Sequence, residues 1–265
     1  MKTRLSILLL SVVILIPLSV MAFSVPSGLT VQETLIPGQR VEGVITLQGG
    51  EDFETVRLYQ TDYLFYADGS NLYGEPGSTA RSNAPWISIY PKEVSIPPGT
   101  SVQVHYQIVV PDTELAGTYW SMVMAEPYVP PLEAPPEEEG KVTLGIRTVL
   151  RYGIQIVTHI GDSGKRELKI IGRQLSQDGQ DLVLSLDIEN TGERWLIPAL
   201  RAEIYDEAGK LVGKKEGDKY RIYPGTSVQG KVKLGSLPKG KYKVLVILDN
   251  GDQYVWGAQY AVNIQ

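Results

Sequence analysis

The sequence contains no cysteine, which removes several classes of function at once. Without thiols there is no disulfide framework, no cysteine nucleophile, no thiolate-bound zinc or iron–sulfur centre and no lipid-anchored cysteine. Histidine is almost as scarce, because His105 and His159 are the only two among 265 residues. A histidine-rich metal centre is therefore disfavoured as well. We expect neither a metal nor a cofactor.

An excess of positive charge is also missing, since 25 Lys and Arg stand against 30 Asp and Glu. A nucleic-acid binder needs a basic face that neutralises phosphates. The balance therefore argues against a nucleic-acid partner.

Long apolar runs are confined to the N-terminus. Lys2 and Arg4 precede an uncharged stretch from Leu5 to Val20, and Ala22 follows as a small residue. This order is typical of a secretory signal peptide cleaved after Ala22. An uncleaved anchor helix is the alternative, although the run is shorter than the ~20 residues that span a bilayer. We predict a signal peptide over residues 1–22, a periplasmic or otherwise extracytoplasmic mature chain, and no membrane span after cleavage.

Past the signal, apolar residues recur at every second position, which is the period of strands that bury one face. The alternation is clear in residues 41–47, 101–110, 182–188 and 242–248. Turn-forming pairs such as Asn250-Gly251 separate the runs. The pattern predicts an all-β protein.

An internal repeat indicates how many domains there are. The hexapeptide Pro-Gly-Thr-Ser-Val-Gln occurs at residues 98–103 and again at 224–229, and each copy is followed by a Gly-x-Tyr strand start, at Gly117 and at Gly240. Two copies of one supersecondary unit predict two tandem immunoglobulin-like β-sandwiches.

The predicted domain boundaries follow from where the alternation stops. Small turn-forming residues cluster at 160–165, so we place the first domain at 23–160 and the second at 165–265. Within the first domain, residues 127–140 contain five Pro and four Glu. They predict an extended, mobile loop, for which a plain flexible connection is the simplest interpretation.

After this loop the alternation runs without a break from Val142 to Val157. A strand of that length would reach roughly 50 Å, well beyond the usual five or six residues. The pattern predicts a long last strand of the first domain, part of which forms a sheet edge. Such an edge can complete another protein's sheet by strand addition.

In this layout the chain resembles the PapD-like periplasmic pilus-assembly chaperones. The likeness covers the export signal, the two sandwiches, and the loop before a long last strand. Residues 144–152 resemble the family's donor strand, and Trp86 to Pro91 followed by Ile96 to Gly99 resembles its strand, Pro and Pro-Gly turn. One feature departs from the family, which has an Arg on its first strand: there is no basic residue between Phe23 and Gln39.

The resemblance implies binding of an exported protein, such as a pilus subunit, rather than catalysis. It implies that apolar side chains are donated to the partner and that a basic residue deep in the interdomain cleft holds the partner's terminal carboxylate. Arg151 is the best match for that base and Arg147 the second. The donated side chains would be Val142, Leu144, Ile146 and Leu150.

Other functions have weaker support in the sequence. Tyr59, Tyr63, Tyr66 and Tyr73 could stack on sugars, which would make the protein a structural or adhesive envelope module, although core packing explains them as well. The tetrapeptide Gly161-Asp162-Ser163-Gly164 is found around the nucleophile of trypsin-like proteases, but Lys165 stands where they have Gly. We predict a protein that is not an enzyme.

Overall fold

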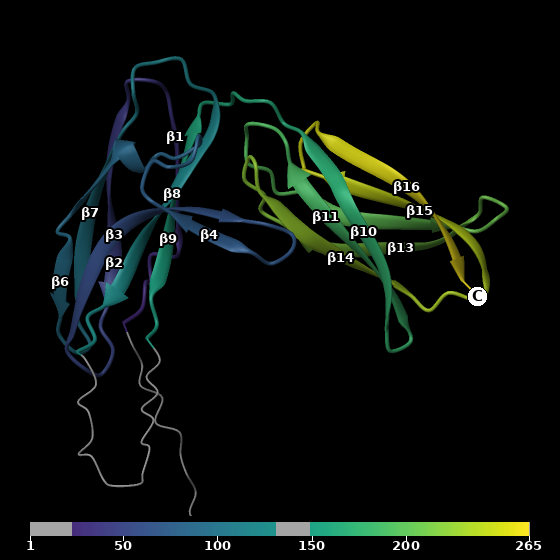
Figure 1. The fold of residues 1–265 in the computed structure, drawn as a ribbon, viewed down its shortest axis with the longest axis horizontal. Helices are drawn as coiled ribbons and strands as arrows, with labels where there is room; N and C mark the ends of the chain where they lie inside the picture. Colours follow the sequence, from purple (N-terminus) through teal and green to yellow (C-terminus); the bar gives the residue numbers. More distant parts are fainter. Residues whose placement is uncertain (1–22, 131–148, 265) are drawn as a thin grey trace, which may run out of the picture.

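The structure is a computed structural model that describes residues 23–130 and 149–264. Its described residues form β-strands and one short 3-10 helix, η1 (Ala84–Trp86). Figure 1 shows two β-sandwiches that meet at an angle, one built from the N-terminal half and one from the C-terminal half. The predicted fold class, all-β with two tandem β-sandwiches, is confirmed. Among the described residues there is no helix long and apolar enough to cross a membrane.

Several predictions concern residues that the structure does not describe. The signal peptide is one of them, and most of the donor segment is another. The signal peptide (1–22), most of the Pro- and Glu-rich loop (131–140) and the donor residues stay predictions, because they lie outside the described residues. These donor residues are Val142, Leu144, Ile146 and Arg147.

The first domain packs two sheets against each other. One sheet has the order β1-β9-β8-β3-β4, with β6 also paired to β3, and the other has the order β2-β7-β5. The strand bounds are β1 (Thr30–Leu35), β2 (Arg40–Gln48), β3 (Glu54–Phe65), β4 (Asn71–Gly74), β5 (Ile87–Tyr90), β6 (Glu93–Ile96), β7 (Ser101–Val109), β8 (Gly117–Pro127) and β9 (Tyr152–Ile160).

The strands form where the sequence alternates, because one face of each is buried. In β7, Val104, Tyr106 and Ile108 are buried while His105 between them is exposed. Burying an aliphatic side chain of this kind contributes about 1.5–3 kcal/mol. Alternation therefore fixes which face of the strand turns toward the core.

Strand β1 determines which part of β9 is enclosed. It runs parallel to β9 and pairs with Gln155–Ile160, whereas β8 pairs antiparallel with β9 from Tyr152 to Ile160. The predicted strand over 142–157 is confirmed from Tyr152 to Val157 and is wrong for residues 149–151, because β9 begins only at Tyr152. The ladder between β8 and β9 ends there, at Ala125, and Pro127, which has no N–H to donate, follows two residues later on β8.

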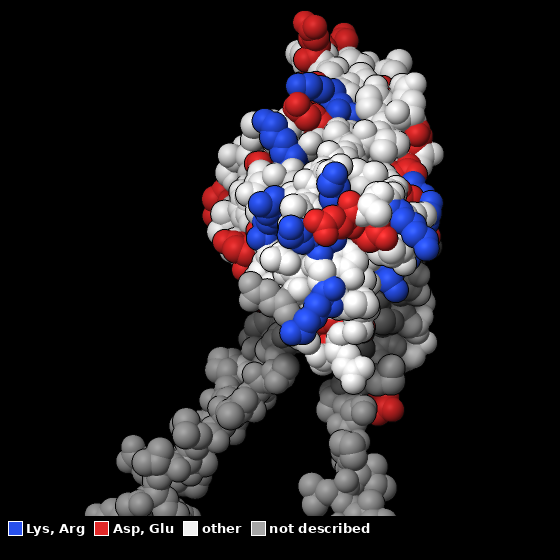
Figure 2. Space-filling view, turned by 90° about the vertical axis from the view of Figure 1, so that its right-hand side faces the viewer, with Lys and Arg blue, Asp and Glu red and all other residues white. Residues whose placement is uncertain are grey.

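The second domain also has two sheets, with the orders β10-β11-β14 and β13-β12-β15-β16. Figure 2 looks at the end of this domain and shows Lys and Arg intermixed with Asp and Glu, so no single sign of charge dominates that face. The strands are β10 (Leu168–Asp178), β11 (Asp181–Asn190), β12 (Ala199–Tyr205), β13 (Leu211–Lys219), β14 (Ser227–Gly235), β15 (Gly240–Asp249) and β16 (Val255–Ile264).

The two copies of the repeated hexapeptide occupy equivalent places. Gly99 and Gly225 have positive φ angles of 64° and 75°, which Gly adopts without strain, and each turn leads into a strand, β7 in one domain and β14 in the other. The repeat therefore marks the same turn and strand in both sandwiches.

A buried carboxylate organises the loop between β4 and η1. Asp62 is almost fully buried and accepts hydrogen bonds from the amides of Gly77 (3.2 Å) and Thr79 (2.7 Å) and from the hydroxyls of Ser78 (3.3 Å) and Ser82 (2.5 Å). Four donors around one carboxylate explain how a charge is tolerated there.

We expect Asp62→Ala to destabilise the protein by about 2–3 kcal/mol, because the buried donors lose a charged acceptor. Denaturant unfolding followed by tryptophan fluorescence measures this. Asp68→Ala is the matched control, since Asp68 is an exposed turn residue bonded to Ser70. A loss no larger than that of the control would show that Asp62 does not organise the loop.

Candidate functional site

The edge of β9 that faces β1 is open where β9 begins. The amide of Gln155 donates to the carbonyl of Leu29 at 2.9 Å, and β1 takes over from there. On this side no described strand pairs with Tyr152–Ile154. Leu150, just before the strand, is 52% exposed. Ile154 is fully buried, and the Tyr152 ring packs on Phe23. An extended segment of another protein can therefore reach the main chain at Gly153, which is half-buried, and the Leu150 side chain.

Arg151 stands at this open end and not deep in the interdomain cleft. Strand β9 has 9 residues and leads into the second domain at Ile160. At ~3.3 Å per residue, Arg151 is roughly 30 Å of strand from the junction. The prediction that Arg151 lies deep between the domains is therefore wrong, because β9 reaches the domain junction only at its other end.

Arg151 shares a carboxylate with two neighbours. Its Nη1 lies 3.9 Å from Oε2 of Glu126, which is also 3.9 Å from Arg57 through Oε1. The Tyr59 hydroxyl donates to the same carboxylate at 2.6 Å. Burial, and next the negative charge and hydrogen bond of Glu126, raise the pKa of Tyr59. Arg151 is thus partly neutralised within its own domain.

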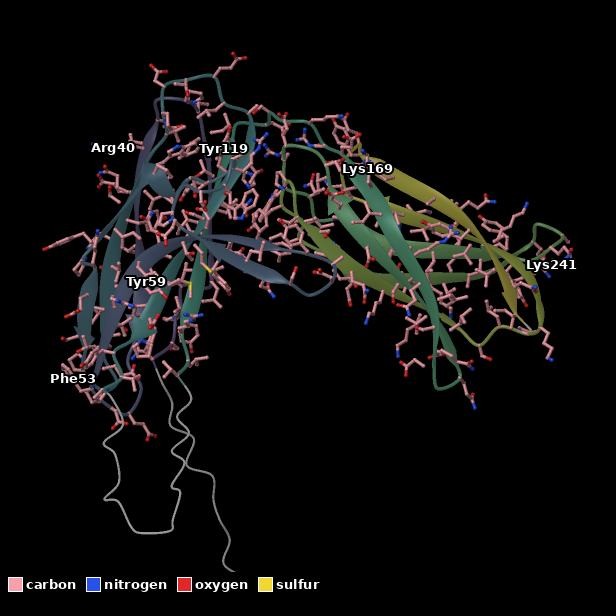
Figure 3. The ribbon with its side chains drawn as sticks, viewed as in Figure 1. Arg40, Phe53, Tyr59, Tyr119, Lys169 and Lys241 are labelled. Carbon is pink, nitrogen blue, oxygen red and sulfur yellow. The ribbon has the colours of Figure 1, made fainter. Side chains whose placement is uncertain are left out.

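The predicted tyrosine surface is divided in the structure. Tyr63 and Tyr73 oppose each other in the β3–β4 ladder, with ring centroids 5.1 Å apart. Tyr59, labelled on the first domain in Figure 3, instead carries Arg57 over its ring at 5.1 Å. Tyr66 lies in the turn that follows β3. Only Tyr63 and Tyr73 form a ring pair among these four, and their binding of glycans stays a prediction.

An aromatic cluster joins the two domains. We call Phe65, Trp120, Val157, Trp195 and Tyr223 the junction cluster. The Tyr223 ring is fully buried and stacks on Trp120 at 4.7 Å between centroids, with Trp195 at 5.5 Å and Phe65 at 6.0 Å. Aromatic pairs of this geometry contribute about 0.5–1.5 kcal/mol each beyond their area burial. The cluster therefore fixes the second domain against the β9–β8–β3 face.

His159 is buried beside the junction cluster, at 1% exposure. Its Nε2 lies 2.9 Å from the amide nitrogen of Gln32, and its Nδ1 lies 2.9 Å from the Thr118 hydroxyl. An amide N–H can only donate, so Nε2 accepts and Nδ1 carries the proton. Burial, and next the charge of Arg194, lower the pKa of His159 to about 4. The imidazole is a neutral structural group.

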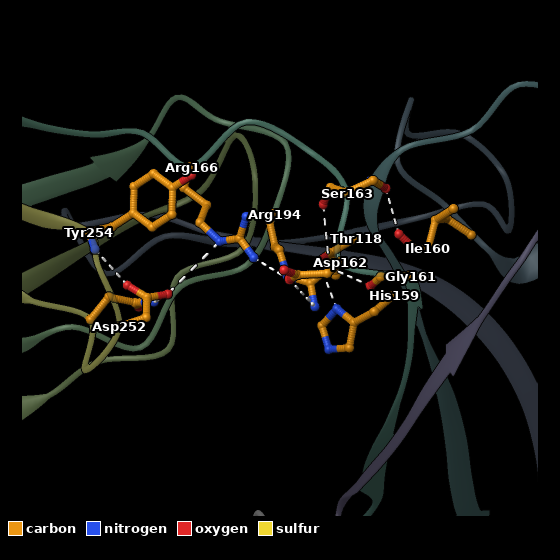
Figure 4. Close-up of polar contacts among 12 residues, drawn as sticks. Thr118, His159, Ile160, Gly161, Asp162, Ser163, Arg166, Arg194, Asp252 and Tyr254 are labelled. Atoms are coloured by element: carbon orange, nitrogen blue, oxygen red, sulfur yellow. Dashed lines mark hydrogen bonds and ion pairs between the residues drawn. The ribbon is translucent and has the colours of Figure 1, made fainter.

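The linker between the domains is held by ion pairs and hydrogen bonds, drawn in Figure 4. Asp162 pairs with Arg166 and lies 3.7 Å from Arg194. The Arg194 guanidinium donates to the Gly161 carbonyl at 2.8 Å, and Arg166 lies 4.0 Å from Asp252. These contacts connect the linker to two loops of the second domain.

Ser163 has no base beside it. Its hydroxyl donates to the Ile160 carbonyl and accepts from the Gly117 amide at 3.1 Å. Both ring nitrogens of His159 are directed at Gln32 and Thr118 instead. The protease-like tetrapeptide therefore forms a structural turn at the junction and has no catalytic arrangement.

Arg221 is an exposed cation at the junction that the sequence did not single out. Its Nη1 donates to the Thr30 hydroxyl on β1 at 3.0 Å, and its guanidinium lies 4.7 Å over the Trp195 ring. Its charge opposes the rise in the pKa of Tyr223 that burial causes. No carboxylate of the described residues forms an ion pair with it. Arg221 is therefore an exposed cation that touches both domains where they meet.

A metal-assisted reaction has no ready site in the part of the chain that is described. No group of three or more His, Asp or Glu side chains there is arranged to hold a metal ion.

No family model and no curated protein matches the sequence. Solved structures do match. A chain of a chaperone–tip adhesin complex of CFA/I fimbriae biogenesis is 13% identical with a TM-score of 0.47, and covers 91% of this chain and 98% of its own. The class 5 fimbriae chaperone CfaA is 12% identical with a TM-score of 0.44, and the match covers 90% of this chain and 98% of CfaA. The YadV chaperone is 16% identical with a TM-score of 0.41, and the match covers 91% of this chain and 100% of YadV. These similarities extend over about nine-tenths of this chain.

Proposed function

We propose that this is an exported, chaperone-like protein that binds another exported protein by strand addition at the start of β9, as in the assembly of a pilus. The open edge at Tyr152 and Gly153 carries the proposal, because on the β1 side no strand of the described residues pairs with this stretch, which is half-buried. Strand addition provides affinity through main-chain hydrogen bonds and specificity through alternate side chains.

The segment just upstream supplies the alternate side chains in this proposal. Leu150 is exposed at the open edge, and the alternating pattern continues back through Ile146, Leu144 and Val142. Each of these apolar side chains would enter a groove in the partner and gain about 1.5–3 kcal/mol if fully buried. Arg147 and Arg151 would lie at the rim of that contact.

Arg221 takes the role that the resemblance gave to a cleft base. A guanidinium has five N–H donors, and the Thr30 hydroxyl accepts from one of them. The remaining donors suit a carboxylate, which Arg binds in a bidentate geometry. Arg151 already lies near Glu126, so Arg221 is the better candidate for the partner's terminal carboxylate.

We expect Arg221→Gln to weaken partner binding roughly tenfold or more, because hydrogen bonds to a charged group contribute about 1.5–3 kcal/mol. Titration with a peptide that copies the partner's C-terminal strand measures this, using the free acid and the C-terminal amide. The wild-type protein should prefer the free acid and Arg221→Gln should not. If Arg221→Gln still prefers the free acid, Arg221 does not bind the terminal carboxylate. If only Arg151→Gln loses the preference, Arg151 binds the carboxylate instead.

The proposed function is tested by co-purification with exported proteins encoded next to this chain's gene, expressed one at a time. The wild-type chain should capture one of them in a stoichiometric complex, and the double variant Leu144→Arg, Ile146→Arg should not. Val44→Arg is the matched control, since Val44 is an exposed apolar residue on the other sheet. Capture by the double variant equal to wild type, with the fold intact, would remove the strand-addition mechanism.

A second candidate function is polysaccharide binding, which the Tyr63–Tyr73 pair favours. Tyr73 is exposed beside Leu72 at the sheet edge, and its ring lies 6.0 Å from the Arg151 guanidinium. Binding on a glycan array that disappears in Tyr73→Ala and persists in Tyr90→Ala would support it. No binding by the wild-type chain would exclude it.

A further inference from the structure

Strand β16 forms a long free edge in the second domain. It pairs with β15 over its 10 residues without a register shift, and no described strand lies on its other side. Figure 1 shows β16 along the upper margin of this domain. Its outer side therefore presents a regular row of N–H and C=O groups.

This edge lacks the features that keep edges from pairing. Between Val255 and Ile264 there is no charged residue and no proline. Natural edge strands are usually kept short, or carry charges, prolines or bulges. The other edge strands of the described chain have such features. Strands β4, β5 and β6 have only four residues each. The longer ones carry charges: β1 contains Glu33, β2 contains Arg40 and Glu42, β10 contains Lys169, Arg173 and a bulge, β13 contains Lys214 and Lys215, and β14 contains Lys231.

The side chains of β16 also leave room for another strand to approach its edge closely. On the solvent face stand Gly257, Gln259 and Ala261, which are small or uncharged, while Tyr260 and Val262 turn toward the core. The Arg173 guanidinium lies 4.6 Å over the Tyr260 ring, and Lys243 on β15 stands opposite Ala261. Both cations belong to neighbouring strands and not to β16 itself.

We propose that β16 pairs with β16 of a second copy of this chain, antiparallel about a two-fold axis, joining two four-stranded sheets into one. A second copy supplies an edge of equal length that is also free of charge, so no like charges meet across the ladder. A two-fold axis makes the contact isologous and closed, so pairing stops at the dimer. The contact is small compared with a standard interface of ~1,600 Å², so the dimer should dissociate on dilution. The proposal is independent of the partner site on β9.

Sedimentation velocity over a concentration series tests the proposal. The wild-type chain should shift from monomer to dimer as its concentration rises. Gln259→Lys should remain monomeric at concentrations where wild type is dimeric, because the two lysines would be directly opposite if the axis passes at Gln259 and diagonal neighbours if it passes at Tyr260. The matched control is Gln174→Lys on the edge strand β10, which should dimerise like wild type. A monomer at every concentration, or a dimer that both variants keep, would overturn the proposal.

A cysteine-free chain allows a second, direct test. In an antiparallel pair, residues on opposite strands are 4.5–5.5 Å apart between Cα atoms, a distance that a disulfide spans. If the axis passes at Gln259, mild oxidation should couple Gln259→Cys to itself. If it passes at Tyr260, Gln259→Cys should couple to Ala261→Cys in a mixture. If none of these samples forms a disulfide faster than Gln174→Cys does, the proposed pairing of β16 with β16 is contradicted. This holds even if the Gln259→Lys variant is monomeric.

Discussion

Tyr223→Ala is expected to lower the free energy of unfolding by about 3–5 kcal/mol, one of the largest losses that a single change in this chain should produce. The ring is fully buried and contacts Trp120, Trp195 and Phe65, and its hydroxyl donates to Gln155 at 2.6 Å. Truncation leaves a cavity between the domains and removes a bond to β9. The second domain should then unfold separately from the first.

Denaturant unfolding monitored by tryptophan fluorescence measures both effects, since Trp120 and Trp195 report on the junction. Tyr223→Phe should lose only about 1–2 kcal/mol, because the ring stays and one hydrogen bond goes. Tyr90→Ala, at a tyrosine that is 77% exposed, should change stability little. A Tyr223→Ala protein within the range of Tyr90→Ala would mean that the junction cluster does not hold the domains together.

The second large effect is a loss of stability in acid that depends on His159. The folded pKa of about 4 is below the ordinary value of 6.5, because of burial and then Arg194. As the pH falls below 6.5 the unfolded chain takes up a proton and the folded chain does not. The free energy of unfolding should therefore be highest above pH 6.5 and should decrease by about 3 kcal/mol as the pH falls to about 4.

The two histidines of the chain provide the comparison. Unfolding free energies at several pH values between 7.5 and 4 should fall less steeply in His159→Gln than in wild type. His105 is exposed on β7, so His105→Gln should keep the wild-type slope. An equal slope in all three proteins would show that other groups, and not the imidazole at the junction, cause the acid sensitivity.

Local patterns predicted much of the fold. Alternation over 101–110 and 182–188 predicted β7 and β11, because a two-residue period and a buried face are local properties of a strand. The repeated hexapeptide predicted equivalent turns for the same reason. What alternation does not contain is the identity of each strand's neighbours.

The errors and omissions come from that missing information. The extent of β9 depends on where β8 can still pair with it, and its enclosure depends on β1, a strand more than a hundred residues away. Arg221 contacts Thr30, 191 positions distant, which no local motif signals.

Hydrogen exchange over residues 149–154, in the chain alone and in complex with its captured protein, tests the central claim most directly. If the partner adds a strand at the open edge of β9, the amides of residues 149–151 and of Gly153 should exchange rapidly in the free chain and become protected in the complex. The amides of Tyr152 and Ile154 are on the side of β8 and should be protected in both samples. Unchanged exchange at 149–154, with protection appearing elsewhere on the molecule, would contradict strand addition and place the partner on a different surface.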